Sequence, residues 1–157
     1  MGGGRYWRPR LVGRRRELAV LESDLKQVVA GGFRGVLLLA DPGVGKSRLG
    51  SEFLARNRGR AVTLTGCANP LGETASFGVW AEALERHLRD CSAEQIRALC
   101  GGFLDDLGVL LRSVAQTRGT APAREPPMPR LLAGMAGLFT ELAARQPVVV
   151  FLDDMHL

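Results

Sequence analysis

The sequence has 157 residues, of which 46% are apolar, a size and composition typical of one globular domain or part of one. Its net charge is +5, of which six arginines before Glu17 contribute +6 and the remaining chain −1. This distribution favours a solvated basic arm over a nucleic-acid-binding surface. The three cysteines lack CxxC spacing, which argues against a disulfide framework and a zinc site. The lack of a long apolar run argues against a signal peptide and a membrane-spanning helix, so the expected location is cytoplasmic.

The first half of the chain predicts the beginning of an α/β fold with a parallel sheet. After a disordered basic arm at residues 1–10, leucines at helical spacing predict an amphipathic helix over residues 16–30. The run VLLLA at residues 36–40 predicts a fully buried strand. A glycine loop then leads into a helix at residues 46–58, and a second strand is expected at residues 61–65. Three apolar side chains of the second helix are expected to be buried: Leu49, Phe53 and Leu54.

The second half predicts mostly helices before a final strand. One helix begins near Phe77, and Trp80 on its apolar face is interpreted as a core residue. Ser92 and Gln95 have the spacing of a capping box that opens the next helix. The remaining expected elements are a short helix at residues 103–114 interrupted by Gly108, a mobile loop at residues 116–129, a long helix through residues 131–142 and a strand at residues 148–154.

The segment ADPGVGKS has the composition of a phosphate-binding loop. It follows a predicted buried strand and opens a predicted helix, where backbone N–H groups and the helix dipole favour an anion. Glycines allow the backbone to turn consecutive N–H groups toward phosphate oxygens. The alternative is a glycine-rich turn with a surface lysine. The candidate nucleotide-binding residues are Ala40, Asp41, Pro42, Gly43, Val44, Gly45, Lys46, Ser47 and Arg48.

Two side chains of this loop have expected roles in ATP binding. Lys46 is predicted to contact the β- and γ-phosphates, and it is also a candidate catalytic residue. The Ser47 hydroxyl is predicted to complete the coordination of Mg²⁺. The motif has Ala40 where the strict pattern has glycine.

A second candidate site lies at the end of the chain. Five apolar residues precede Asp153 and Asp154, which places Asp153 at the carboxyl end of a predicted buried strand, where ligands of α/β sheets gather. Asp153 is predicted to hold Mg²⁺, and Asp154 to orient or deprotonate a water molecule. The alternative is a strand that merely ends in a turn.

Other chemically suggestive residues are interpreted as structural. The same four letters, FLDD, also occur at residues 103–106, where no strand precedes them, so Asp105 and Asp106 are expected on a solvated helix face. His87 and His156 have no partners at metal-ligand spacing and are expected on a helix surface and in a loop.

Three segments together resemble one family: LVGRRREL at residues 11–18, ADPGVGKS at 40–47 and VVVFLDDMHL at 148–157. The chain is similar to the AAA-like, origin-recognition-like ATPase domain of bacterial STAND-type signalling ATPases, including LuxR-type ATP-binding regulators. The resemblance covers residues 11–157 and implies a three-layer P-loop fold with a parallel sheet that is incomplete at its C-terminal end. It also implies that Val12, Gly13 and Arg14 contact the base or ribose. The family commonly continues DDxHW, whereas this sequence has DDMHL.

The resemblance further implies elements that follow residue 157: a strand with a sensor residue, an arginine finger, lid helices, a repeat domain and an output domain. We therefore expect the sequence to be a fragment of a longer product that, by itself, is marginally folded and a poor ATPase. The implied function is an ATP- or ADP-operated signalling switch that reaches DNA only through an output domain and leaves self-association open. The alternatives are a P-loop kinase-like enzyme, a GTPase, which the absence of NKxD disfavours, and a non-hydrolysing remnant or interaction module.

Overall fold

The computed structural model describes residues 13–68, 77–119 and 125–155, and the expected basic arm at residues 1–10 lies outside them. The chain divides into two compact units, residues 1–57 and residues 58–157. Each unit has its own secondary structure and is described by itself.

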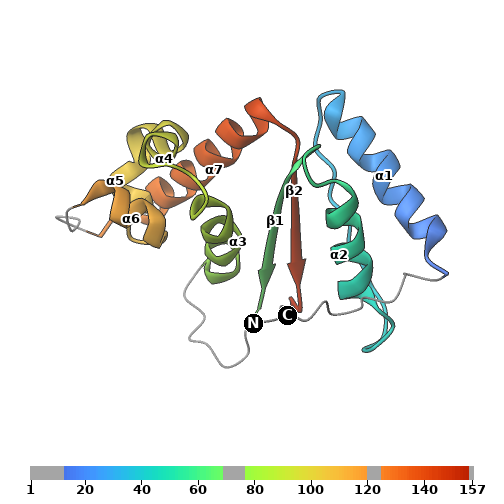
Figure 1. The fold of residues 1–157 in the computed structure, drawn as a ribbon. Helices are drawn as coiled ribbons and strands as arrows, with labels where there is room; N and C mark the ends of the chain where they lie inside the picture. Colours follow the sequence, from blue (N-terminus) through green and yellow to red (C-terminus); the bar gives the residue numbers. More distant parts are fainter. Residues whose placement is uncertain (1–12, 69–76, 120–124, 156–157) are drawn as a thin grey trace, which may run out of the picture. The chain divides into compact units, whose positions relative to one another are not determined.

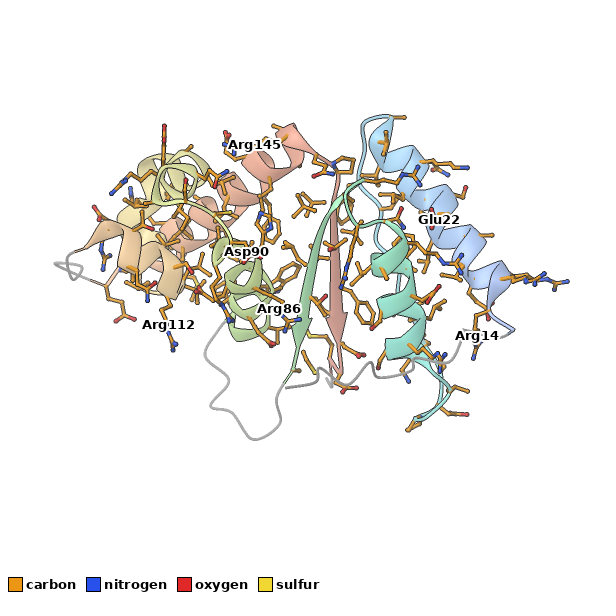
Figure 2. The ribbon with its side chains drawn as sticks, viewed as in Figure 1. Arg14, Glu22, Arg86, Asp90, Arg112 and Arg145 are labelled. Atoms are coloured by element: carbon orange, nitrogen blue, oxygen red, sulfur yellow. The ribbon has the colours of Figure 1, made fainter. Side chains whose placement is uncertain are left out.

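The N-terminal unit contains two helices, α1 (Arg15–Val29) and α2 (Lys46–Arg56), drawn in blue and blue-green in Figure 1. Both confirm the helices expected from apolar periodicity, and Leu49, Phe53 and Leu54 of α2 are buried as predicted. The buried Asn57 side chain donates hydrogen bonds to the Phe53 carbonyl oxygen, 2.9 Å away, and to Glu22 Oε1 on α1, 3.2 Å away. These bonds connect the end of α2 with the middle of α1, where Figure 2 labels Glu22.

The strand predicted at residues 36–40 does not form, and that prediction is wrong. Leu37 and Leu39 are 79% and 82% exposed, and residues 36–40 have no regular structure. A strand requires a second strand to pair its backbone N–H and C=O groups, and the described part of the N-terminal unit contains only helices as regular elements. The apolar composition therefore predicted burial that these residues do not attain.

The C-terminal unit contains a two-stranded parallel sheet, which confirms the α/β class. Strand β1 (Val62–Cys67) pairs with β2 (Val148–Asp153) in a register that joins Val62 to Val148 and Cys67 to Asp153. β1 begins and ends slightly later than expected, and every residue of β2 is half-buried rather than fully buried. Two strands are present among the described residues, fewer than a complete three-layer P-loop fold requires.

Helices α3 (Gly78–Leu88) and α7 (Met128–Arg145) confirm two predicted helices, and α4 (Ala93–Cys100) begins with the predicted Ser92–Gln95 capping box. The helix expected at residues 103–114 is instead divided into three short elements. They are a 3₁₀ turn, η1 (Gly101–Phe103), and two helices, α5 (Leu104–Leu107) and α6 (Arg112–Arg118). Gly108 is the C-cap of α5. The loop expected at residues 116–129 is also shorter, because residues 116–118 belong to α6 and residues 128–129 begin α7.

The core of this unit lies between these helices and the sheet. Trp80 of α3 is half-buried and meets Phe139 of α7 edge to face, with ring centroids 5.8 Å apart, which supports its interpretation as a packing residue. α3 packs against β1, and Figure 1 shows this helix in yellow-green beside the strand. The largest fully buried apolar side chains of the unit are Leu64, Leu84, Leu88, Leu107, Leu111, Val114 and Leu138.

The expectation that Asp105 and Asp106 share a solvated helix face is wrong for Asp106. Asp105 is exposed, but Asp106 is only 7% exposed and accepts two hydrogen bonds from Arg130 of α7, at 2.8 and 2.7 Å. The Arg130 guanidinium also lies 5.6 Å from the ring centroid of Phe103. Sequence spacing could not predict this pair, because the partners lie on different helices 24 positions apart.

The Asp106–Arg130 pair predicts a pH-dependent contribution to stability. Hydrogen bonds from Arg130 lower the pKa of the Asp106 carboxyl, so the folded state binds a proton there less readily than the unfolded state does. We expect Asp106→Asn to destabilise the unit at pH 7 and the deficit relative to wild type to shrink as the pH falls through the lowered pKa. Urea unfolding at several pH values measures this, with Asp105→Asn as the exposed control. A deficit that is equal at pH 7 and pH 3 would contradict the assignment.

Candidate functional site

The candidate phosphate-binding loop has the backbone conformation that its glycines permit. Gly43 and Gly45 have φ angles of +82° and +90°, in the left-handed region that side chains disfavour. A Cβ atom placed on either glycine would meet no atom within 4 Å among those described. Gly45 is the N-cap of α2, so the loop opens directly onto the N-terminus of a helix. This arrangement leaves space in front of a helix N-terminus, the setting in which proteins bind anions.

The Lys46 ammonium group lies folded over this loop. Its Nζ atom donates hydrogen bonds to the carbonyl oxygens of Ala40, 2.7 Å away, and Asp41, 3.2 Å away. Within the described residues, no carboxylate forms an ion pair with Lys46. The ammonium charge is therefore balanced only by carbonyl dipoles, and a phosphate group would be a stronger partner.

Other residues of the loop also have accessible groups. Ser47 and Arg48 are exposed on the first turn of α2, and Asp41 and Pro42 are exposed before the two glycines. A serine hydroxyl at this position fits a magnesium ligand, and the open loop, whose ammonium group has no carboxylate partner among the described residues, fits phosphate oxygens. The loop residues therefore fit a Mg-nucleotide.

The arginine of the VGR segment contacts the loop from α1. Gly13 has a φ angle of +81°, and Arg14 follows it as the N-cap of α1. Arg14 Nη2 donates to the Val44 carbonyl oxygen at 3.0 Å, while Nη1 donates to Glu17 Oε1 at 2.6 Å. The structure thus brings Arg14 and the loop together. Val12 lies outside the described residues, and base or ribose contacts for Gly13 and Arg14 stay predictions.

The carboxylates of the second candidate site lie at the end of β2. Asp153 is the last residue of the strand and is half-buried, which confirms its predicted position. Asp154 is exposed and has a φ angle of +51°, and its backbone N–H donates to Asp153 Oδ1 at 3.1 Å. Aspartate tolerates this left-handed conformation better than most residues. The chain therefore turns sharply directly after Asp153.

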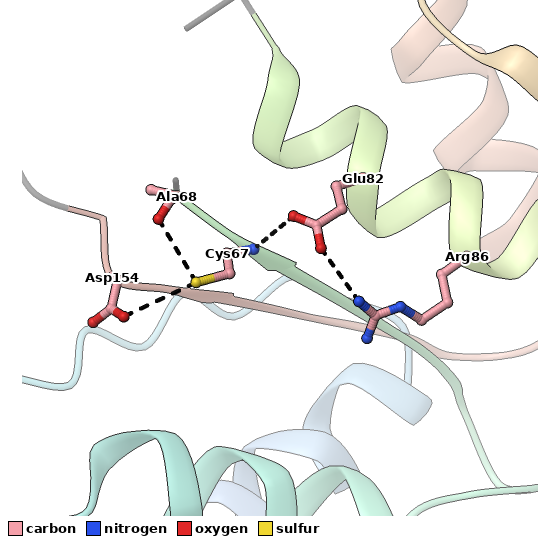
Figure 3. Close-up of polar contacts among 5 residues, drawn as sticks. All are labelled: Cys67, Ala68, Glu82, Arg86 and Asp154. Atoms are coloured by element: carbon pink, nitrogen blue, oxygen red, sulfur yellow. Dashed lines mark hydrogen bonds and ion pairs between the residues drawn. The ribbon is translucent and has the colours of Figure 1, made fainter. Parts of the chain in front are cut away.

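Sequence analysis did not predict the polar contacts around Cys67, shown in Figure 3. The Cys67 N–H donates to Glu82 of α3 at 3.2 Å, and Glu82 also accepts from Arg86 at 3.2 Å. Cys67 Sγ lies 3.9 Å from Asp154 Oδ2. Partial desolvation, followed by the negative charges of Asp154, Asp153 and Glu82, raises the pKa of the Cys67 thiol. The thiol is therefore protonated at neutral pH and is a poor nucleophile.

No local sequence pattern marks this cysteine, because its neighbours depend on the register between β1 and β2. Parallel strands β1 and β2 end at the same edge of the sheet, and their register pairs Cys67, the last residue of β1, with Asp153, the last residue of β2. In the part of the chain that the structure describes, no group of three or more His, Cys, Asp or Glu side chains could hold a metal ion, and this includes the residues around Cys67. His87 is half-buried, and desolvation lowers its pKa, while His156 lies outside the described residues.

None of the helices in the described segments has the length and hydrophobicity needed to cross a membrane. Comparison with protein-family models gives a match to the AAA ATPase domain over residues 10–157. Searches among curated proteins and among solved structures gave no match. The family match covers the loop, the VGR segment and both terminal aspartates.

Proposed function

Because this chain belongs to the AAA ATPase domain family, we propose that its loop at residues 40–47 binds the phosphates of ATP and ADP. The observation that carries the proposal is the Lys46 ammonium group, which lies over an open glycine loop and, among the described residues, donates only to the carbonyls of Ala40 and Asp41. A bound nucleotide would give this charge oxygen partners of opposite sign. The first turn of α2 adds backbone N–H groups that favour the same anion.

The proposed metal is Mg²⁺, which would neutralise part of the phosphate charge when bound. The ligands proposed from the sequence motifs are the hydroxyl of Ser47, a residue at the start of α2, and the carboxylate of Asp153, a residue at the end of β2. Asp154 is the proposed group that orients or accepts a proton from a water molecule. Its exposure and the sharp turn at its backbone leave this carboxylate open to solvent.

The proposed biological role is a nucleotide-operated switch in a signalling or regulatory ATPase. This role is supported by the family match and by the resemblance of the VGR segment to STAND-type regulators. DNA contact is proposed only for a separate output domain. A kinase-like enzyme and a non-hydrolysing interaction module are the competing functions. Measuring ADP and inorganic phosphate with and without a phosphoryl acceptor distinguishes all three, because an ATPase forms both products, a kinase forms ADP without inorganic phosphate when the acceptor is present, and a non-hydrolysing module forms neither.

Titration of the protein with a fluorescent ATP analogue, with and without Mg²⁺, tests nucleotide binding. Saturable binding that ATP and ADP compete away, and that weakens when Mg²⁺ is removed, is the expected result. The absence of binding by a folded protein, as judged by its helical circular dichroism, would overturn the proposal.

The metal assignment predicts a specific effect of Asp153→Asn. Loss of one carboxylate should raise the Mg²⁺ concentration needed for half-maximal ATP binding by about 10-fold, the magnitude of one charge-assisted interaction. Affinity for ATP without metal should change little. Asp105→Asn is the matched control, since Asp105 occupies the same position in the FLDD segment at residues 103–106 and is exposed on α5. Equal shifts in both variants would contradict a metal role for Asp153.

A further inference from the structure

The Arg14 side chain donates a hydrogen bond to the backbone of the candidate phosphate-binding loop. The guanidinium group uses two neighbouring nitrogen atoms, Nη2 on the Val44 carbonyl oxygen at 3.0 Å and Nη1 on Glu17 at 2.6 Å. Glu17 lies one helical turn along α1 and fixes the guanidinium from the other side. Figure 2 shows Arg14 at the beginning of this helix. The contact spans 30 positions of sequence.

The contacted carbonyl belongs to the peptide bond between Val44 and Gly45. A trans peptide is planar, and its C=O and N–H groups point in opposite directions. A donor that holds the Val44 oxygen on the α1 side therefore turns the Gly45 N–H away from α1. Among the described residues this N–H has no hydrogen-bond acceptor, and Gly45 is the N-cap of α2, where unpaired N–H groups attract anions.

This geometry matters because the loop has few internal restraints. Gly43 and Gly45 allow many backbone conformations, so the peptide plane between Val44 and Gly45 needs an external contact to keep one orientation. The internal hydrogen bond from the Val44 N–H to the Asp41 carbonyl is long, at 3.5 Å. The bond from Arg14 is shorter and comes from a charged donor.

We propose that Arg14 is a positioning residue that orients the Gly45 N–H toward the phosphates of the nucleotide, and that Glu17 orients Arg14. This inference rests on the proposed nucleotide-binding function. It assigns Arg14 to the phosphate end of the ligand, whereas a base contact would assign it to the opposite end. The two assignments predict different losses for different ligands.

The test compares Mg²⁺-tripolyphosphate, ATP and GTP as competitors of a fluorescent ATP analogue. For Arg14→Ala we expect affinity for tripolyphosphate and for both nucleotides to fall by about 10-fold, the size of one lost interaction with a charged group. The ratio of ATP to GTP affinity should stay unchanged, because no base contact is removed. Arg14→Lys should recover part of the lost affinity, since an ammonium group can still donate to the Val44 carbonyl. It lacks the planar guanidinium group that contacts Val44 and Glu17 with two nitrogen atoms at once.

Glu17 supplies a second readout that a general loss of stability would not reproduce. Glu17→Gln should weaken tripolyphosphate binding less than Arg14→Ala, and the double variant should be no weaker than Arg14→Ala because Glu17 acts through Arg14. Arg56→Ala is the matched control. Arg56 forms an ion pair with Glu52 on the surface of α2, 2.9 Å away, and has no hydrogen bond or ion pair with the loop among the described residues. Variants are compared at equal helical circular dichroism.

Tripolyphosphate affinity that is unchanged in Arg14→Ala would overturn the inference while nucleotide binding by wild type stands. A large fall in the ratio of ATP affinity to GTP affinity in Arg14→Ala, without loss of tripolyphosphate binding, would also overturn the inference and would identify a base contact. A wild-type protein that binds neither tripolyphosphate nor ATP would overturn the nucleotide-binding proposal and this inference together.

Discussion

Replacing Lys46 with alanine is expected to lower the affinity for Mg-ATP by about 10- to 100-fold, since hydrogen bonds to charged groups contribute roughly 1.5 to 3 kcal/mol. The ammonium group is the side-chain cation that donates to the loop carbonyls of Ala40 and Asp41, and no carboxylate in the described part of the chain neutralises it. Isothermal titration with ATP, ADP, AMP and tripolyphosphate measures the effect.

The pattern of loss across ligands makes this prediction specific. Tripolyphosphate and ATP should lose the most affinity and AMP the least, because Lys46 is assigned to the β- and γ-phosphates. Lys46→Arg keeps the charge but places a planar group in the loop, so it should restore binding only partly. Arg56→Ala removes a cation from the same helix and should leave binding unchanged. Equal losses for AMP and ATP in Lys46→Ala would contradict the assignment.

Gly66→Ala is expected to destabilise the C-terminal unit by about 3 kcal/mol, at the upper end of what overpacking costs. A Cβ atom on Gly66 would overlap the Val79 carbonyl oxygen and lie 2.9 Å from Val79 Cγ1. The obstructing oxygen belongs to the backbone of α3, so a side-chain rotation cannot remove the overlap, and α3 must move away from β1. Thermal unfolding should show a fall in Tm of roughly 10 to 20 °C for a unit of this size.

A second glycine-to-alanine change in the same unit gives the opposite expectation. A Cβ atom on Gly137, in α7, would lie 3.9 Å from two atoms of the Phe103 ring, an ordinary contact. Alanine is favoured over glycine within a helix by about 0.8 to 1 kcal/mol, so Gly137→Ala should stabilise the unit slightly. If both variants change Tm by the same amount, the close approach of α3 to β1 is not what excludes a side chain at residue 66.

Sequence reasoning succeeded where a structure depends on neighbours along the chain. The helical spacing of Leu49, Phe53 and Leu54 predicted the buried face of α2, because periodicity near 3.6 residues places them on one side of a helix. The capping box was equally local, since Ser92 and Gln95 satisfy each other's backbone groups three positions apart. The position of Asp153 at the end of a strand followed from the apolar run before it.

Predictions failed where a residue's environment depends on a distant partner. The run VLLLA at residues 36–40 has the composition of a strand, but a strand forms only when another strand pairs with its backbone. Asp106 resembles a solvated acid in sequence, whereas Arg130 of another helix pairs with it in a buried position. Neither outcome is encoded in the residues immediately around these positions.

The sequence by itself determined the glycine loop, the helix that follows it, the capping box and the aspartate at the end of β2, because local backbone preferences and hydrophobic periodicity specify each of them. Only the tertiary structure decided that Arg14 reaches the Val44 carbonyl, that Cys67 lies beside the terminal aspartates and that Gly66 admits no side chain. These contacts join residues 13 to 87 positions apart, and their existence depends on how helices and strands pack, which short-range spacing does not specify.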